Sequence, residues 1–204
     1  MKLTAVLVLL AGVALSAYWL LTPSTPGDES PEAGFARDMQ VHHAQAVRMA
    51  MVVRDRTTDP EIRTLAYDIA TTQQHQIGQM YAWLTLWGLP QAPSGPPMTW
   101  MRDHHADTPG EPASMPGMAT ADQLKALEKA SGREAEVLFL RLMIPHHQGG
   151  ASMAQAALQL TAQREVRLLA QAMLTAQSSE IEVMRRLLTA RGDSGLQKTS
   201  AAGP

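Results

Sequence analysis

The chain contains an internal duplication, and this feature restricts its fold more than any other. When the 204-residue sequence is shifted by 104 positions, His42 and His43 fall on His146 and His147 without a gap. About a third of the positions agree over roughly 50 residues in this single register, which chance does not produce. Further matched pairs are Phe35 with Phe139, Met39 with Met143, Met49 with Met153, Glu61 with Glu165, Gln73 with Gln177, and Met80 with Met184. Whatever structure one copy forms, the other is expected to form as well.

Each copy is expected to form a helical hairpin. Start signals made of a capping residue, Pro and Glu predict helices over residues 31–56 and about 60–88 in the first copy, within a repeat that spans residues 31–90. The second repeat, residues 132–191, is expected to contain helices up to about residue 160 and from about residue 162 onward. Two hairpins of this length favour an antiparallel four-helix bundle.

Capping boxes support two further helix starts. Ser131 and Glu134 have the spacing of a capping box at the start of the third long helix, and Thr120 and Gln123 have it before a short helix over residues 122–130. No segment shows sustained alternation of apolar and polar residues, so strands are not expected. The sequence therefore predicts an all-α fold.

Two adjacent His residues lie at the edges of the apolar stripe of each first helix. At about 100° per residue, Met39, His42, His43 and Met49 fall within one core-facing arc. The second copy repeats this pattern with Met143, His146, His147 and Met153. A Met stripe is more often core than ligand, and duplication copies core residues as readily as ligands. However, four imidazoles that point into one bundle need polar partners, which favours metal binding.

Glu180 places a carboxylate on the otherwise apolar stripe of the last helix, where the first copy has the neutral Gln76. A buried carboxylate must be paired or bind a ligand, because its burial alone costs several kcal/mol. We expect it to pair with His146 or His147, as a ligand or as the group that orients a ligand. The two copies are therefore expected to form unequal sites.

The crossover between the hairpins, residues 90–120, is rich in Pro, Gly, Met and His. A connection this long without regular structure is usually functional or disordered, and Met residues in an exposed segment have little packing role. Clusters of thioether and imidazole groups suit Cu(I). The weaker candidate ligands are Met98, Met101, His104, His105, Met115 and Met118. His75 lies on the far side of its helix from the apolar stripe and is expected to face solvent.

Composition removes several classes of function. The chain has no Cys, which excludes disulfides, iron–sulfur clusters, thiolate zinc sites and thiol nucleophiles. Its net charge of −2 argues against nucleic acid as the main partner, because neutralising phosphates needs clustered Lys and Arg. With 13 Met and 7 His residues, thioether and imidazole are the remaining soft and borderline metal ligands.

The N-terminus is expected to place the protein outside the cytoplasm. Residues 3–21 are uncharged and apolar, and their length is close to the roughly 20 residues that span a bilayer. Because Tyr18 and Trp19 continue this run past a possible signal-peptidase site, an uncleaved membrane anchor over residues 1–22 is favoured over a cleaved signal peptide. Residues 23–30 are expected to be a linker, and residues 192–204 a disordered tail.

Three segments resemble the domain of unknown function 305 family: FARDMQVHHAQAVRMA, MPGMATADQLKALEKASG and RLMIPHHQGGASMA. The resemblance covers about residues 31–191. It implies a ferritin-like duplicated bundle of an exported bacterial protein. It also implies copper binding through Met39, His42, His43, Met143, His146, His147 and Met153, because the family includes periplasmic copper-binding proteins linked to copper resistance.

The leading hypothesis is therefore an extracytoplasmic copper-binding protein without catalytic activity, with Cu(I) favoured and Cu(II) also accommodated. One alternative is a membrane-tethered helical scaffold that binds no metal. Another is a di-iron enzyme, but that site needs several inward Glu residues and Glu-x-x-His motifs, and the sequence contains no Glu-x-x-His.

Overall fold

The computed structural model describes residues 12, 25–92, 95–104 and 115–193, and this part of the chain contains helices and no strands. The all-α prediction is confirmed. The long helices are α2 (Pro31–Arg56), α3 (Pro60–Leu86), α5 (Gly132–Leu160) and α6 (Arg164–Ala190). Two short ones, the 3-10 helix η1 (Thr99–His104) and α4 (Ala121–Lys129), belong to the crossover.

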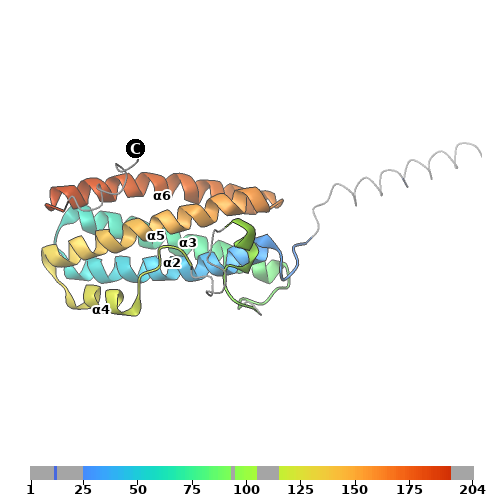
Figure 1. Ribbon diagram of the computed structural model, residues 1–204, viewed down its shortest axis with the longest axis horizontal. Coiled ribbons are helices and arrows are strands. Elements are labelled where there is room, and N and C mark those ends of the chain that lie inside the picture. Colours follow the sequence, from blue (N-terminus) through green and yellow to red (C-terminus); the bar gives the residue numbers. More distant parts are fainter. Residues whose placement is uncertain (1–11, 13–24, 93–94, 105–114, 194–204) are drawn as a thin grey trace, which may run out of the picture.

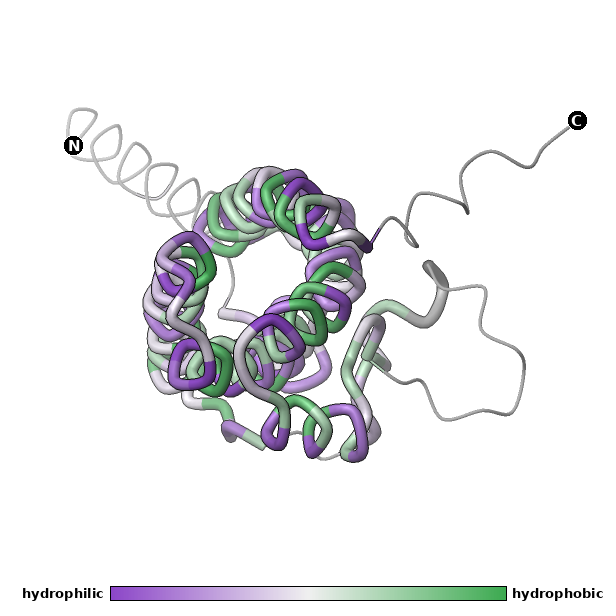
Figure 2. Tube along the Cα trace, turned by 90° about the vertical axis from the view of Figure 1, so that its left-hand side faces the viewer, coloured by the Kyte–Doolittle hydropathy of each residue, from purple (hydrophilic) through white to green (hydrophobic). Residues whose placement is uncertain are grey.

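The long helices lie side by side as two hairpins (Figure 1). Helix α3 packs along α2, α6 packs along α5, and the hairpins meet through α2 and α5. Seen from one end, the four helices form a ring with α4 outside it (Figure 2). The short helix η1 lies at the end where α2 begins, and α4 lies toward the opposite end (Figure 1).

Local signals in the sequence explain most helix ends. The Ser30 side chain accepts a hydrogen bond from the N–H of Ala33, and Asp59 caps α3 in the same way. The capping box of Thr120 and Gln123 is present. The one expected at Ser131 is wrong, because Ser131 makes no side-chain capping bond. Helix α6 begins two residues later than expected, at Arg164, since residues 161–163 are extended.

The sequence predicts an exposed crossover without regular structure. The described part of the crossover differs from this prediction. Met98 and Met101 are each only 1% exposed, and Trp100 is buried beside them against Phe35. Met115 and Met118 are partly buried. The crossover therefore covers the bundle with these side chains and adds to its core.

Apart from Gly12, the predicted anchor lies outside the described residues, as do residues 23–24 of the linker and 194–204 of the tail. No helix in the described ranges has the length and apolar character that a membrane span requires.

Candidate metal site

A polar layer crosses the middle of the bundle between two apolar clusters. One cluster contains Met49, Met143 and Met184, and the other contains Met39, Met80 and Met153. On every long helix, the residues of the two clusters are separated by buried or half-buried polar side chains. These side chains form the polar layer: His42 and His43 on α2, Gln73 and Gln76 on α3, His146 and His147 on α5, and Gln177 and Glu180 on α6.

The Nε2 atom of each imidazole in the polar layer faces an oxygen that accepts a hydrogen bond. His43 Nε2 lies 2.7 Å from Gln76 Oε1, and His147 Nε2 lies 2.7 Å from Glu180 Oε2. His42 Nε2 lies 3.1 Å from the Pro116 carbonyl oxygen, and His146 Nε2 lies 3.1 Å from the His42 carbonyl oxygen. Because carbonyl and carboxylate oxygens only accept, the proton of a neutral ring belongs on Nε2, and Nδ1 is then the nitrogen that carries the lone pair.

Several acceptor atoms of the polar layer have no partner. They are the Nδ1 atoms of His42, His43 and His147 and the Oε1 atoms of Gln73 and Gln177. Buried polar atoms are normally satisfied, so a layer with five unpartnered acceptors is unusual. A cation is the kind of group that satisfies lone pairs, and ligand imidazoles commonly donate their other N–H to a carboxylate or carbonyl, as these rings do.

The imidazoles of the polar layer are packed against one another, and burial keeps three of them, His42, His43 and His146, neutral at pH 7. The rings of His42 and His146 lie with their centroids 3.8 Å apart at an angle of 33°. Burial lowers the pKa of His42 to about 4 and that of His43 to about 3, and it also holds the pKa of His146 well below its ordinary value. Neutral imidazole is the form that binds a metal, so protons compete only weakly with a cation here.

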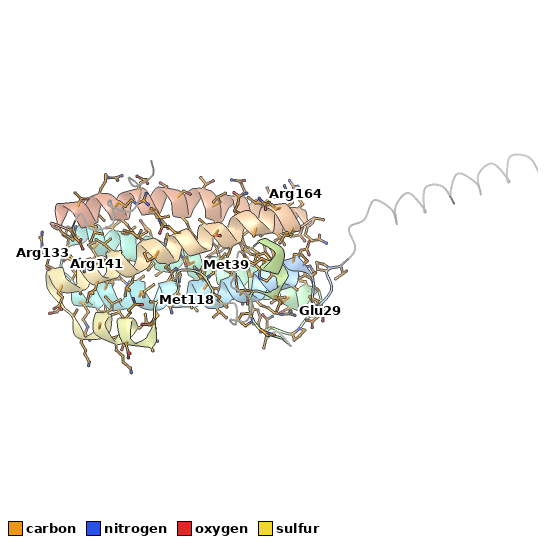
Figure 3. The ribbon with its side chains drawn as sticks, viewed as in Figure 1. Glu29, Met39, Met118, Arg133, Arg141 and Arg164 are labelled. Carbon is orange, nitrogen blue, oxygen red and sulfur yellow. The ribbon has the colours of Figure 1, made fainter. Side chains whose placement is uncertain are left out.

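The thioethers divide between the two sides of the polar layer. Because α2 and α5 run antiparallel, Met39 shares its cluster with Met153 of the other copy, and Met143 shares its cluster with Met49. Figure 3 shows Met39 between the helices near the middle of the bundle. Each side therefore offers sulfur atoms, and the side of Met39 also holds the buried crossover residues Met98 and Met101.

A turn of the crossover closes over the polar layer. Besides the Pro116–His42 bond, the Ala119 N–H donates to Gln45 Oε1 at 2.7 Å, and Gln45 donates back to the Ala119 carbonyl at 3.0 Å. The contact with α5 needs Gly149, because a Cβ there would lie 2.0 Å from the Pro116 oxygen. The turn also packs closely on α5 at Gly117, since a Cβ there would lie 2.1 Å from the Pro145 oxygen, and the neighbouring Met118 is labelled in Figure 3.

A buried carboxylate fixes the other described part of the crossover. Asp38 accepts hydrogen bonds from the Met98 N–H at 2.7 Å and from Trp100 Nε1 at 2.9 Å. Burial raises the pKa of Asp38 despite these bonds. The hydrogen bond from the Met98 N–H to Asp38 also holds Met98 at a φ of 63°. This is a left-handed backbone conformation that is rare for a residue with a side chain.

The structure brings some of the predicted ligands together. The four His residues share one layer, Glu180 pairs with His147, and the Gln76–His43 pair makes the two copies unequal, as expected. His75 is exposed, and its Nε2 lies 3.0 Å from Nε2 of Gln79. His105 lies outside the described residues, and only the backbone of His104 is described.

Within the described ranges, no three His, Asp or Glu side chains lie close enough together to hold a metal ion. A metal in the polar layer would therefore need another type of donor beside these groups, or a shift of the imidazoles.

Sequence reasoning missed Gln73 and Gln177 as members of the site. Both occupy the apolar stripe and recur in the duplication, and this recurrence at a polar position was the signal that could have found them. The packing of residues 115–119 on α5 had no comparable local signal, because it depends on contacts between distant segments.

The fold and the site define a class of protein: a duplicated helical protein that encloses a layer of buried imidazoles. The family model described as "Domain of unknown function (DUF305)" matches residues 32–188, and the chain therefore belongs to the DUF305 family. A search of curated proteins finds no match to this chain.

Solved structures give the same assignment. The chain is 48% identical to the "putative secreted protein DUF305 from Streptomyces coelicolor", with a TM-score of 0.76 over 82% of this chain and 97% of that one. It is 34% identical to a DUF305 fragment from Deinococcus radiodurans, with a TM-score of 0.64 over 83% and 99% of the two chains. It is 26% identical to CopM in the Cu(II)-bound form, with a TM-score of 0.57 over 79% and 97%.

Proposed function

We propose that this protein binds copper ions in the polar layer of the bundle and sequesters them outside the cytoplasm. The observation that carries the proposal is the set of unpartnered acceptors, the Nδ1 atoms of His42, His43 and His147 and the Oε1 atoms of Gln73 and Gln177, all buried between thioether clusters. Copper is the cargo of this function, and the bundle supplies the ligands.

The chemistry of the donors favours copper over harder cations. Thioether sulfur suits Cu(I) and imidazole suits both Cu(I) and Cu(II), whereas Mg²⁺ and Ca²⁺ prefer sets of oxygen ligands. CopM, a structural neighbour at 26% identity, is described in a Cu(II)-bound form, and at 25% in a Cu(I)-bound form. We propose Cu(I) as the favoured state here, because Met ligands outnumber carboxylates around the layer.

The proposed ligands are His42, His43 and His147 through their unpartnered Nδ1 atoms, together with His146, Met39, Met49, Met143 and Met153. Glu180 serves the second copy, as a ligand or as the carboxylate that orients His147. The described crossover residues Met98, Met101, Met115 and Met118 are secondary candidates, and the expected ferritin-like arrangement belongs to the same proposal.

We favour binding over catalysis because a carboxylate-bridged di-iron enzyme needs several inward carboxylates. In the polar layer, Glu180 is the one carboxylate that the structure places next to an imidazole.

We also propose that residues 1–22 tether the bundle to the outer face of the cytoplasmic membrane. The support is the uncharged run over residues 3–21, whose length suits a bilayer. Cell fractionation tests this part separately: the full chain should stay with the membranes after a high-salt wash, and release of a shortened chain into the soluble fraction would indicate a cleaved signal.

The binding proposal is tested by titrating Cu(I), against a chromophoric competitor, into the wild-type chain, the His146→Ala/His147→Ala variant and the His75→Ala control. The double variant should lose at least one equivalent of tightly bound Cu(I), and the exposed-residue control should bind as the wild type does. Equal stoichiometry and affinity in all three proteins would remove the second His pair from the site.

A further inference from the structure

A groove opens between α3 and α6 on one side of the bundle. Each of these helices packs against its hairpin partner, and between them they leave a cavity of about 670 Å³. Its lining includes Glu61, Thr64 and Asp68 from α3 and Glu180, Arg186 and Leu187 from α6. Its floor at Leu187 is buried, whereas Glu61, Thr64 and Asp68 are exposed.

The groove has a negative charge. Three carboxylates, from Glu61, Asp68 and Glu180, are opposed by the single guanidinium of Arg186. A concave surface with charge of one sign focuses its field and raises the local concentration of counter-ions. A cation is therefore attracted to this face of the bundle.

Glu180 connects the groove with the polar layer. Its side chain is 22% exposed and lines the groove, while its Oε2 accepts the hydrogen bond from the fully buried His147. The corresponding pair in the first copy lacks such a connection, because Gln76 is neutral and only 8% exposed. The pair of Glu180 and His147 thus combines a solvent-facing carboxylate with a buried imidazole.

We propose that the groove between α3 and α6 is the route by which the cation reaches the buried imidazoles, with Glu180 as its first protein ligand. This inference rests on the proposed function. It adds the path that the cation takes into the bundle and the order in which the cation contacts the protein side chains. The cation is drawn in by Glu61 and Asp68 and exchanges water for the Glu180 carboxylate. It then moves to the unpartnered Nδ1 of His147 as the bundle relaxes around it, while the proton stays on Nε2.

The charge of the groove affects the association rate constant of the cation more than the equilibrium affinity of the protein for it. Charges outside the final binding site steer the encounter and change the association rate constant, with a smaller effect on equilibrium affinity. Their effect also decreases with salt, because the Debye length shortens to about 8 Å at 0.15 M ionic strength.

The experiment mixes the full chain, purified in a mild detergent, with Ag(I) in a stopped-flow instrument and follows tryptophan fluorescence. Ag(I) is a soft monovalent cation that needs no reductant. In the Glu61→Gln/Asp68→Asn variant, association at low salt should slow by about threefold to tenfold, and the difference should shrink as salt is added. The amount of Ag(I) bound at equilibrium should not change. Thr64→Arg, which adds bulk and positive charge to the groove, should slow association further.

Two matched controls separate the groove from the rest of the surface. Glu165→Gln neutralises the repeat counterpart of Glu61, and Thr72→Arg adds the same side chain at another exposed position of α3; neither residue lines the groove. Both should associate at the wild-type rate. Wild-type rates in the groove variants, with Ag(I) still bound, would overturn the access route and leave the proposed function intact. Absence of Ag(I) and Cu(I) binding by the wild-type chain would overturn both.

Discussion

Acidification from pH 7 to pH 5 should destabilise the metal-free fold through its buried imidazoles. An unfolded imidazole titrates near 6.5, whereas the folded pKa is about 4 for His42 and about 3 for His43. Between these values the unfolded chain binds more protons than the folded one. The stability contributed by neutral burial is therefore fully present above pH 6.5 and is lost as the pH falls toward the folded pKa values.

The size of this effect follows from the pKa differences. At pH 5 an imidazole with an unfolded pKa of 6.5 and a folded pKa near 4 weakens folding by about 2 kcal/mol relative to pH 7, and His42 and His43 together by about 4 kcal/mol. The pKa of His146 is lowered in the same direction and adds to the loss. Small domains have roughly 5–15 kcal/mol of stability, so the change is large enough to measure.

Urea unfolding of the metal-free protein at pH 7, 6 and 5 provides the assay, with the free energy of unfolding as the readout. In the His43→Gln variant, the decrease in the free energy of unfolding between pH 7 and pH 5 should be about 2 kcal/mol smaller than in the wild type. This difference does not depend on the variant's own stability at pH 7. In His75→Gln, which replaces an exposed ring, the loss should match the wild type. A free energy of unfolding that does not change with pH, or that falls equally in all three proteins, would refute the reasoning.

Three other outcomes are expected. Gly149→Ala should destabilise the fold by about 1–3 kcal/mol in thermal unfolding, because its Cβ meets the backbone of Pro116. Gly150→Ala should cost less, because the nearest atoms to its Cβ belong to the end of the Gln177 side chain, and equal losses would contradict the packing of the crossover turn. Asp38→Asn should cost about 1–3 kcal/mol and shift the fluorescence of Trp100 to longer wavelength, and an unchanged spectrum would count against the Asp38–Trp100 bond. Copper affinity at His42, His43 and His146 should change little between pH 7 and 5, because burial lowers the pKa of these three rings and keeps them neutral; a tenfold loss per pH unit in a competition titration would show that protons are displaced from them.

Much of the fold could be predicted from the duplication. The matched His pairs placed two helices in one register, and caps such as Ser30 and Asp59 marked where helices begin. The difference between Gln76 and Glu180 predicted unequal copies. These features depend on neighbours within one or two helical turns, so the sequence displays them directly.

The rest depends on contacts between distant segments. Met98 and Met101 lie in a segment that reads as a polar loop, and they are buried because Asp38, 60 residues earlier than Met98, fixes the loop on α2. Likewise, the sequence does not show which Nδ1 atoms lack a partner, because this depends on which oxygen accepts the hydrogen bond from each Nε2. By contrast, the division of the Met residues between two clusters follows from the antiparallel packing of equal repeats. This division could have been predicted from the sequence.

X-ray absorption at the copper edge of the Cu(I)-loaded chain tests the central proposal most directly, because it distinguishes sulfur from nitrogen ligands. The account predicts both scatterers around copper in the wild type, and loss of the nitrogen contribution when His42, His43, His146 and His147 are all replaced by Ala. Copper surrounded by oxygen and nitrogen without sulfur, or a spectrum that the four substitutions leave unchanged, would contradict it.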